Sequence, residues 1–177
     1  MTARRRIRYS VAMSLDGYIA GPNGEYDWIE VDPSASAAYF KAFYAQFDTA
    51  IMGRKSYEQA GGGVSPFKTY VLSRTLHPRK HGKVTVLGAD ALARIAALRE
   101  EPGKDIWLWG GGEAFGSLAA ADLVDTVEIG VIPVLLGAGR KVMEGCDQRV
   151  KLIPRASDLE LVGHTLLCYD VVKRKVS

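Results

Sequence analysis

Apolar residues along the chain form short strand-like runs that alternate with segments whose apolar positions recur at helical spacing. Such alternation predicts a mainly parallel sheet that is covered by helices on both faces, which is an α/β fold. The expected strands span 6–13, 49–52, 69–72, 84–87, 106–109 and 124–133, and the expected helices span 34–47, a short stretch from 54, 90–99 and 113–120.

Two regions depart from this alternation. Residues 14–32 carry glycines and a proline and predict a long loop. Near the C-terminus, alternating apolar positions predict antiparallel strands over 159–162 and 165–173, and 135–140 is rich in glycine. In the helix predicted over 34–47, Ser34 is a candidate N-cap, and the side chains expected on one face are Tyr39, Phe40, Phe43 and Phe47.

Composition narrows the class of protein. The chain has 177 residues, of which 47% are hydrophobic and 24% charged, so we expect one domain over 1–177 with a core of about 6–173. The net charge is +3 and is concentrated in an Arg-rich N-terminal stretch over 4–6 without a basic stripe, so nucleic acid is not an expected partner. No apolar run approaches the roughly 20 residues that span a membrane, and we expect no signal peptide before the first strand.

Cysteine and histidine usage gives no metal site. Cys146 and Cys168 lack the spacing of metal ligands, and they are typical of reduced thiols in a cytoplasmic protein. The three histidines are scattered, so each is expected on the surface or in a loop: His77, His81 and His164.

The run Trp109-Gly110-Gly111-Gly112-Glu113 stands between a predicted strand and a predicted helix. Consecutive glycines allow a sharp turn and close approach of a ligand, and the helix N-terminus favours a phosphate group. A plain tight turn is the alternative.

Two further strand ends carry similar groups. One strand runs into Gly53 and is followed by Arg54, Lys55 and Ser56; another ends in Ser73 and Arg74. Because Arg binds phosphate through a bidentate fork, Arg54 and Arg74 together suit an isolated phosphomonoester such as the 2′-phosphate of NADPH. The alternative is that both belong to a solvated face.

These motifs resemble the dihydrofolate reductase-like fold, and are most similar to stand-alone relatives of the reductase domain of bacterial riboflavin biosynthesis. The resemblance covers about residues 6–173. It rests on five motifs in order, which are 11–20, 52–57, 71–74, 109–113 and 133–139.

The resemblance implies an α/β three-layer sandwich that binds NADPH. It implies that Ala12 and Ile19 face the nicotinamide, that Ile19 lies on a mobile loop over 14–27, and that a cis peptide joins Gly110 to Gly111. The remaining implied cofactor contacts are Gly53, Arg54, Lys55, Ser56, Leu72, Ser73, Arg74, Gly112, Glu113 and Phe115.

The proton that accompanies hydride transfer needs a source. Asp16 and Asp27 are the candidates, although Asp before Gly17 is also a standard turn pair. Three aromatic side chains are candidates for a wall against a flat heterocycle, or else ordinary core: Trp28, Tyr39 and Phe40.

The chain departs from both named enzymes. Residues 34–40 lack the carboxylate with which dihydrofolate reductases bind a pterin, and riboflavin-pathway reductases tend to carry Lys near Ser10 and Glu at Trp109. The leading hypothesis is an NADPH-dependent reductase of a small heterocycle such as 5-amino-6-(5-phosphoribosylamino)uracil. A dihydrofolate or pteridine reductase and a nucleotide-binding module without turnover are the alternatives. We also expect a homodimer that pairs through the C-terminal strands.

Overall fold

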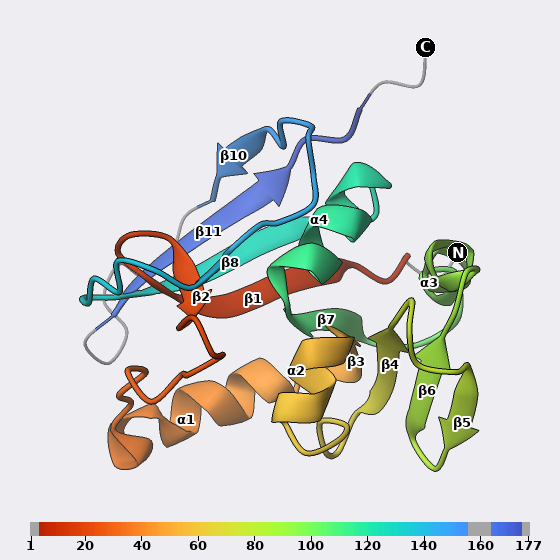
Figure 1. The fold of residues 1–177 in the computed structure, drawn as a ribbon, viewed down its shortest axis with the longest axis horizontal. Coiled ribbons are helices and arrows are strands. Elements are labelled where there is room, and N and C mark those ends of the chain that lie inside the picture. The colour runs from red at the N-terminus through yellow and green to blue at the C-terminus, as the bar shows by residue number, and fades with distance from the viewer. Residues whose placement is uncertain (1–3, 156–163, 175–177) are drawn as a thin grey trace.

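A nine-stranded sheet in the order β10-β11-β8-β1-β7-β3-β4-β6-β5 runs through the protein (Figure 1). The structure is a computed structural model and describes residues 4–155 and 164–174. Pairing is parallel from β8 to β6 and antiparallel at both edges. The strands are β1 (Ile7–Ser14), β3 (Phe47–Gly53), β4 (Lys68–Leu72), β5 (Arg79–His81), β6 (Val84–Leu87), β7 (Asp105–Gly110), β8 (Thr126–Ile132), β10 (Leu152–Pro154) and β11 (Thr165–Val171).

Helices cover both faces of this sheet. On one face, α3 (Ala91–Leu98) and α4 (Gly112–Ala120) pack with Ile106 and Leu108 of β7. On the other face, α1 (Pro33–Tyr44) and α2 (Arg54–Gln59) pack with the alternate β7 residues Trp107 and Trp109. The predicted α/β sandwich, with a mainly parallel sheet and antiparallel C-terminal strands, is confirmed.

Under α1, an aromatic cluster surrounds a buried ion pair. Phe43 of α1 meets Trp107 edge to face, with ring centroids 5.4 Å apart. Arg8 lies 4.7 Å from the ring centroid of Phe47 and donates to both carboxylate oxygens of Glu128, at 2.8 and 2.9 Å. The cluster therefore fixes α1 against β1 and β8 through both apolar and charged contacts.

The boundaries of α1 differ from the predicted 34–47. The N-cap is Asp32 rather than Ser34, because Asp32 Oδ1 accepts hydrogen bonds from the backbone N–H groups of Ser34 and Ala35 at 2.8 and 3.3 Å. The helix ends at Tyr44, and Phe47 already belongs to β3. A proline next in the chain allows Asp32 to end the extended segment and cap the helix.

The sequence pattern did not predict several short strands. The predicted loop 14–32 contains β2 (Tyr18–Ala20), which pairs with β9 (Arg140–Lys141) in a second sheet. The strands β5 and β10 were also missed, since β5 is wholly polar and β10 has only three residues. The strand predicted over 159–162 lies outside the described residues. Among the described strands, β11 pairs with β8 on one side and with β10 on the other.

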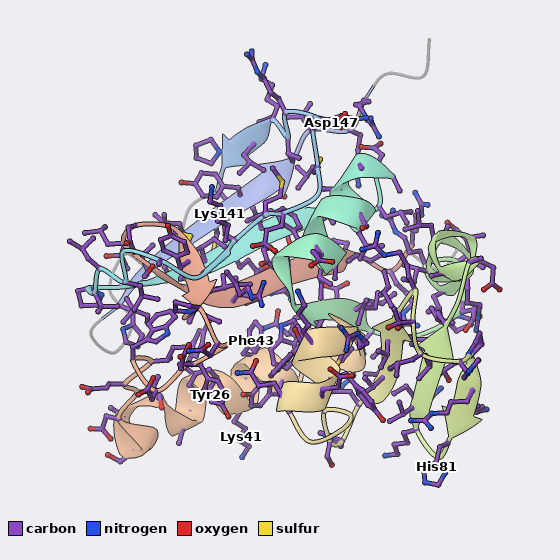
Figure 2. All side chains as sticks on the ribbon, viewed as in Figure 1. Tyr26, Lys41, Phe43, His81, Lys141 and Asp147 are labelled. Carbon is purple, nitrogen blue, oxygen red and sulfur yellow. The ribbon has the colours of Figure 1, made fainter. Side chains whose placement is uncertain are left out.

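Figure 2 shows the side chains on this ribbon, with Phe43 turned toward the interior and Lys41 of the same helix turned outward. Within the described parts of the chain, no helix has the length and apolar character needed to cross a membrane.

Candidate functional site

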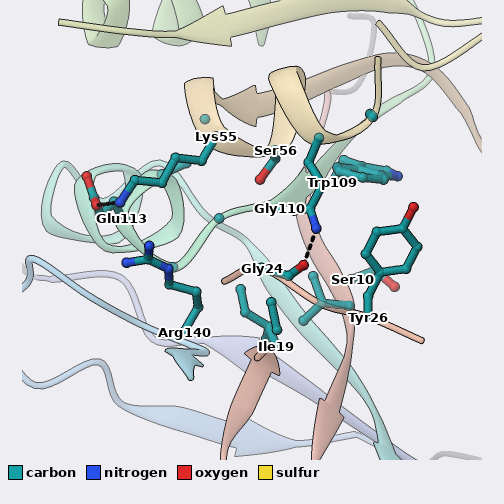
Figure 3. Close-up of a pocket in the computed structure, with 18 of the residues that line it drawn as sticks. Ser10, Ile19, Gly24, Tyr26, Lys55, Ser56, Trp109, Gly110, Glu113 and Arg140 are labelled. Carbon is teal, nitrogen blue, oxygen red and sulfur yellow. Dashed lines mark hydrogen bonds and ion pairs between the residues drawn. The ribbon is translucent and has the colours of Figure 1, made fainter. Parts of the chain in front are cut away.

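A cavity of about 1370 Å³ opens where strands β7, β3 and β4 end (Figure 3). These strands are parallel neighbours, so their last residues, Gly110, Gly53 and Leu72, meet at one edge of the sheet. Ligands in parallel α/β sheets bind at this edge. Typical small-molecule pockets measure roughly 300–1,000 Å³, so this cavity has room for a dinucleotide and a second small molecule.

The glycine run turns the chain from β7 into α4. The peptide between Gly110 and Gly111 is trans, which corrects the implied cis bond; the cis peptide in the described residues joins Ser65 to Pro66. Gly111 makes the turn with a φ of +90°, in the left-handed region that favours glycine.

Two of these glycines also serve packing within the chain. A Cβ on Gly111 would lie 3.3 Å from Ser56 Oγ of α2, and a Cβ on Gly112 would lie 2.3 Å from the carbonyl oxygen of Lys141. The run therefore lets α4 approach both α2 and β9. Close approach of a ligand is only one of the reasons for the glycines.

Charged side chains gather at one end of the cavity, which we call the charged end. The Glu113 carboxylate lies 3.2 Å from Lys55 Nζ and 3.4 Å from Arg74 Nη2, and Arg54 pairs with Glu58 at 2.9 Å. Figure 3 shows Lys55, Glu113 and Arg140 on this side. The charged lining residues are Arg54, Lys55, Glu58, Arg74, Glu113, Arg140 and Glu144.

The opposite end is built from rings, and we call it the aromatic end. Tyr39 stacks on Phe43 with ring centroids 6.0 Å apart, and burial raises the pKa of the Tyr39 phenol. Figure 3 places Trp109 and Tyr26 here. The aromatic end is lined by Tyr26, Tyr39, Phe40, Phe43, Tyr44, Trp107 and Trp109.

A loop segment lies along the cavity between these ends. Asn23, Gly24, Tyr26, Ile29 and Val31 are among the lining residues. The side-chain amide of Gln59 in α2 donates to the carbonyl oxygen of Gly24, so the loop is tied to the opposite wall (Figure 3).

Most predicted cofactor and substrate residues line this one cavity. The residues brought together are Ala12, Ile19, Tyr39, Phe40, Gly53, Arg54, Lys55, Ser56, Leu72, Ser73, Arg74, Gly110, Gly111, Gly112 and Glu113. Their roles toward a ligand remain predictions.

Four predicted residues lie elsewhere. Asp16 accepts hydrogen bonds from Ser14 Oγ at 2.6 Å and from the backbone N–H of Gly137 at 2.7 Å, so it forms the turn. The Ser14 bond is the main cause that lowers the pKa of Asp16. Asp27 is exposed and outside the lining, and Trp28 donates through Nε1 to the carbonyl oxygen of Glu25 at 3.1 Å.

Phe115 is the fourth. Its ring stacks on Tyr9 with centroids 4.1 Å apart and an interplanar angle of 11°, inside the core between β1 and α4. Phe115 therefore packs in the core and is not among the residues that line the cavity.

Several residues line the cavity that the sequence did not mark as candidate site residues. Among them are Ser10, Tyr26, Arg140 and His164. Arg140 follows the glycine-rich segment, which was a usable signal. His164 was expected on the surface or in a loop, yet both its ring nitrogens are buried and have no hydrogen-bond partner among the described residues. No pattern near His164 could have shown this, because the cavity wall is formed by strands distant in sequence.

The sheet order, the two helical layers and a cavity at the strand ends define a dihydrofolate reductase-like α/β protein. Residues 66–173 match the RibD C-terminal domain, and the chain belongs to this family.

Known proteins agree with this assignment. The chain is 33% identical to the uncharacterized protein YyaP of Bacillus subtilis (strain 168) over 165 residues, covering 84% of this chain and 86% of that protein. It superimposes on a putative riboflavin biosynthesis protein from Shewanella sp. PV-4 with a TM-score of 0.80 and 25% identity, covering 95% and 99% of the two chains. A dihydrofolate reductase from Enterococcus faecalis, complexed with NADP(H) and RAB-propyl, shares the fold with a TM-score of 0.65 and 20% identity, covering 94% and 96%.

Proposed function

We propose that this protein is an NADPH-dependent reductase that acts on a small heterocycle of the riboflavin-pathway type. One observation carries the proposal: a single cavity joins a charged end, built from three strand ends, to an aromatic end. Family membership supports it, because the relatives include a putative riboflavin biosynthesis protein and share their fold with an NADP(H)-bound dihydrofolate reductase.

The residues present fit a dinucleotide. Gly53 and Gly111 line the cavity and carry no side chain, so a phosphate group could approach the backbone closely at these strand ends. The N-terminus of α4 lies at the same place and favours an anion. Arg54 and Arg74 line the cavity and supply guanidinium forks for an isolated phosphate.

Bound NADPH would supply a hydride, and this chain would orient it and exclude water. Ala12 and Ile19 line the cavity and would hold the nicotinamide. The Gln59 contact to Gly24 keeps the loop across the cavity, which limits access of water. The aromatic end would stack a flat substrate beside the cofactor.

Two alternatives have less support. The first turn of α1 holds no acidic residue, so the carboxylate that a pterin site requires is missing there. A nucleotide-binding module without turnover would need only the charged end, and would leave the aromatic end without a role.

The test is calorimetric titration with NADPH and NADH side by side. We expect NADPH to bind more tightly, and the double variant Arg54→Ala/Arg74→Ala to weaken NADPH by about ten-fold or more while leaving NADH nearly unchanged. Arg79→Ala is the control, since Arg79 is exposed on β5 away from the cavity. Equal loss for both nucleotides would contradict the assigned 2′-phosphate site.

We also propose a homodimer that forms through the C-terminal strands. Among the described strands β10 is an edge of the sheet and exposes Ile153, and a sheet edge can pair with a second copy. Light scattering that gives a monomer would contradict this.

A further inference from the structure

The two ends of the cavity differ completely in charge. Every Lys, Arg, Asp or Glu among its described lining residues comes from α2, α4, the residue after Ser73 or the segment 140–144. The aromatic end holds rings and aliphatic side chains and no charged group among the described residues. A phosphate group there would lose its hydration without gaining a cation.

The cation beneath this end is already satisfied. Arg8 is buried below α1, donates to both carboxylate oxygens of Glu128, and donates to Gln46 Oε1 at 2.6 Å. Its guanidinium is further covered by the rings of Phe43 and Phe47. Arg8 Nη1 also lies 3.4 Å from Asp105 Oδ2, so four of its five N–H groups have acceptors in the protein, and its charge is already balanced by Glu128.

One polar side chain at this end is buried without a hydrogen-bond partner among the described residues. His164 lines the cavity, and among the described residues it is the one whose buried side-chain nitrogens make no hydrogen bond. It directly precedes β11, in which Leu166 lies opposite Gly130. Its neighbours on this face of the sheet, Gly130, Ile132 and Leu166, also line the cavity and offer no polar side chain.

An unpaired buried imidazole is unfavourable unless something else bonds to it. A neutral imidazole donates through one nitrogen and accepts through the other, so it can pair with a ring carbonyl or a ring N–H of a ligand. Aromatic walls favour a flat ring. The unpaired imidazole, the aromatic walls and the lack of charged lining residues together favour an uncharged, planar ligand with hydrogen-bonding groups at its edge.

We propose that the aromatic end binds an uncharged, planar heterocycle that carries no phosphate group, and that His164 makes the hydrogen bond that orients it. The proposal rests on the reductase function proposed above, and it narrows the substrate class. It differs from the phosphoribosyl substrate that the family resemblance implies.

The first test compares a matched pair of probes, 5-amino-6-(ribosylamino)uracil with and without its 5′-phosphate. Binding is followed by quenching of tryptophan fluorescence, because Trp107 and Trp109 line this end. We expect the phosphate-free probe to bind about ten-fold more tightly, with or without NADPH. Equal or tighter binding of the phosphorylated probe overturns the proposal, and so does failure of both this probe and 5,6-diaminouracil to bind.

The second test addresses His164. His164→Leu should weaken the phosphate-free probe by about ten-fold and leave NADPH affinity unchanged, whereas His164→Gln should restore much of the loss. The ¹⁵N resonances of the imidazole should shift when the probe is added. A resonance that does not move, or a His164→Leu variant that binds normally, overturns the role of His164.

Controls separate the possible failures. His81→Leu, on the exposed strand β5, should change neither affinity, and thermal unfolding reports whether each variant folds. If the wild-type protein does not bind NADPH, the proposed function is contradicted. Normal NADPH binding with a preference for the phosphorylated probe would contradict only the present inference.

Discussion

The carboxylate of Glu113 lies 3.2 Å from Lys55 Nζ and 3.4 Å from Arg74 Nη2, so one acidic side chain engages two cations of the charged end. Glu113 stands in the first turn of α4, where its charge is favourable toward the helix dipole. The same position is the one proposed for phosphate groups. The anion site therefore already contains an anion of the protein.

Removing this charge should strengthen cofactor binding. We expect Glu113→Gln to raise NADPH affinity about two- to five-fold, a modest factor because exposed ion pairs are worth little. Glu101→Gln, which breaks an exposed pair with Arg94, is the matched control. Calorimetry that shows weaker NADPH binding in Glu113→Gln would instead mean that Glu113 bonds directly to the cofactor.

Gln59 is expected to hold the loop across the cavity. Gln59→Ala removes the hydrogen bond to the Gly24 carbonyl, so hydrogen exchange over residues 21–29 should become faster. Exchange in β7 should stay unchanged and serves as the internal control. Unchanged exchange over 21–29 would show that other contacts hold this loop.

Gly116 is expected to be essential for packing of the segment after β9. A Cβ at Gly116 would lie 2.0 Å from the carbonyl oxygen of Glu144, which is backbone and cannot turn away. Gly116→Ala should cost about 1–3 kcal/mol of unfolding free energy, measured by denaturant titration. Gly130→Ala is the control, because a Cβ there meets nothing within 4 Å; equal stability of both variants would contradict the argument.

The buried pair of Arg8 and Glu128 gives a double-mutant test. Glu128→Leu leaves a buried guanidinium without its main partner and should cost about 3–5 kcal/mol of unfolding free energy. Adding Arg8→Met should recover much of that loss, since both buried charges are then gone. Simple addition of the two single effects would contradict the coupling.

The lowered pKa of Asp16 should make the free energy of unfolding depend on pH. Hydrogen bonds from Ser14 and from the backbone of Gly137 and Leu136 lower the pKa of Asp16 below its ordinary 3.8. The carboxylate therefore stabilises the fold above that value, and the contribution is lost as pH falls through the lower folded-state pKa. Asp16→Asn should be less stable than wild type at neutral pH and should show a smaller loss on acidification in denaturant titrations. Parallel acid profiles would contradict this.

The sequence by itself determined the layered α/β architecture. Its apolar runs located β1, β3, β4, β6, β7 and β8, and the alternating positions over 165–173 located β11, because burial on a sheet face imposes a repeating pattern on nearby residues. It also located the strand ends that carry Gly53, Arg74 and Gly110, since glycine and charged residues at such junctions have a local physical reason. The short strands β2, β5, β9 and β10 lacked that local signal, being two or three residues long.

Only the tertiary structure decided which of these residues share a cavity. The parallel order β7-β3-β4 brings three distant motifs to one edge, while Phe115 turns inward to Tyr9 and Asp16 bonds to the turn at Gly137. The same packing buries both nitrogens of His164 in the cavity wall. These outcomes depend on strand order and register, which join residues as far apart in the chain as Asp16 and Gly137 and therefore leave no trace in any local stretch of sequence.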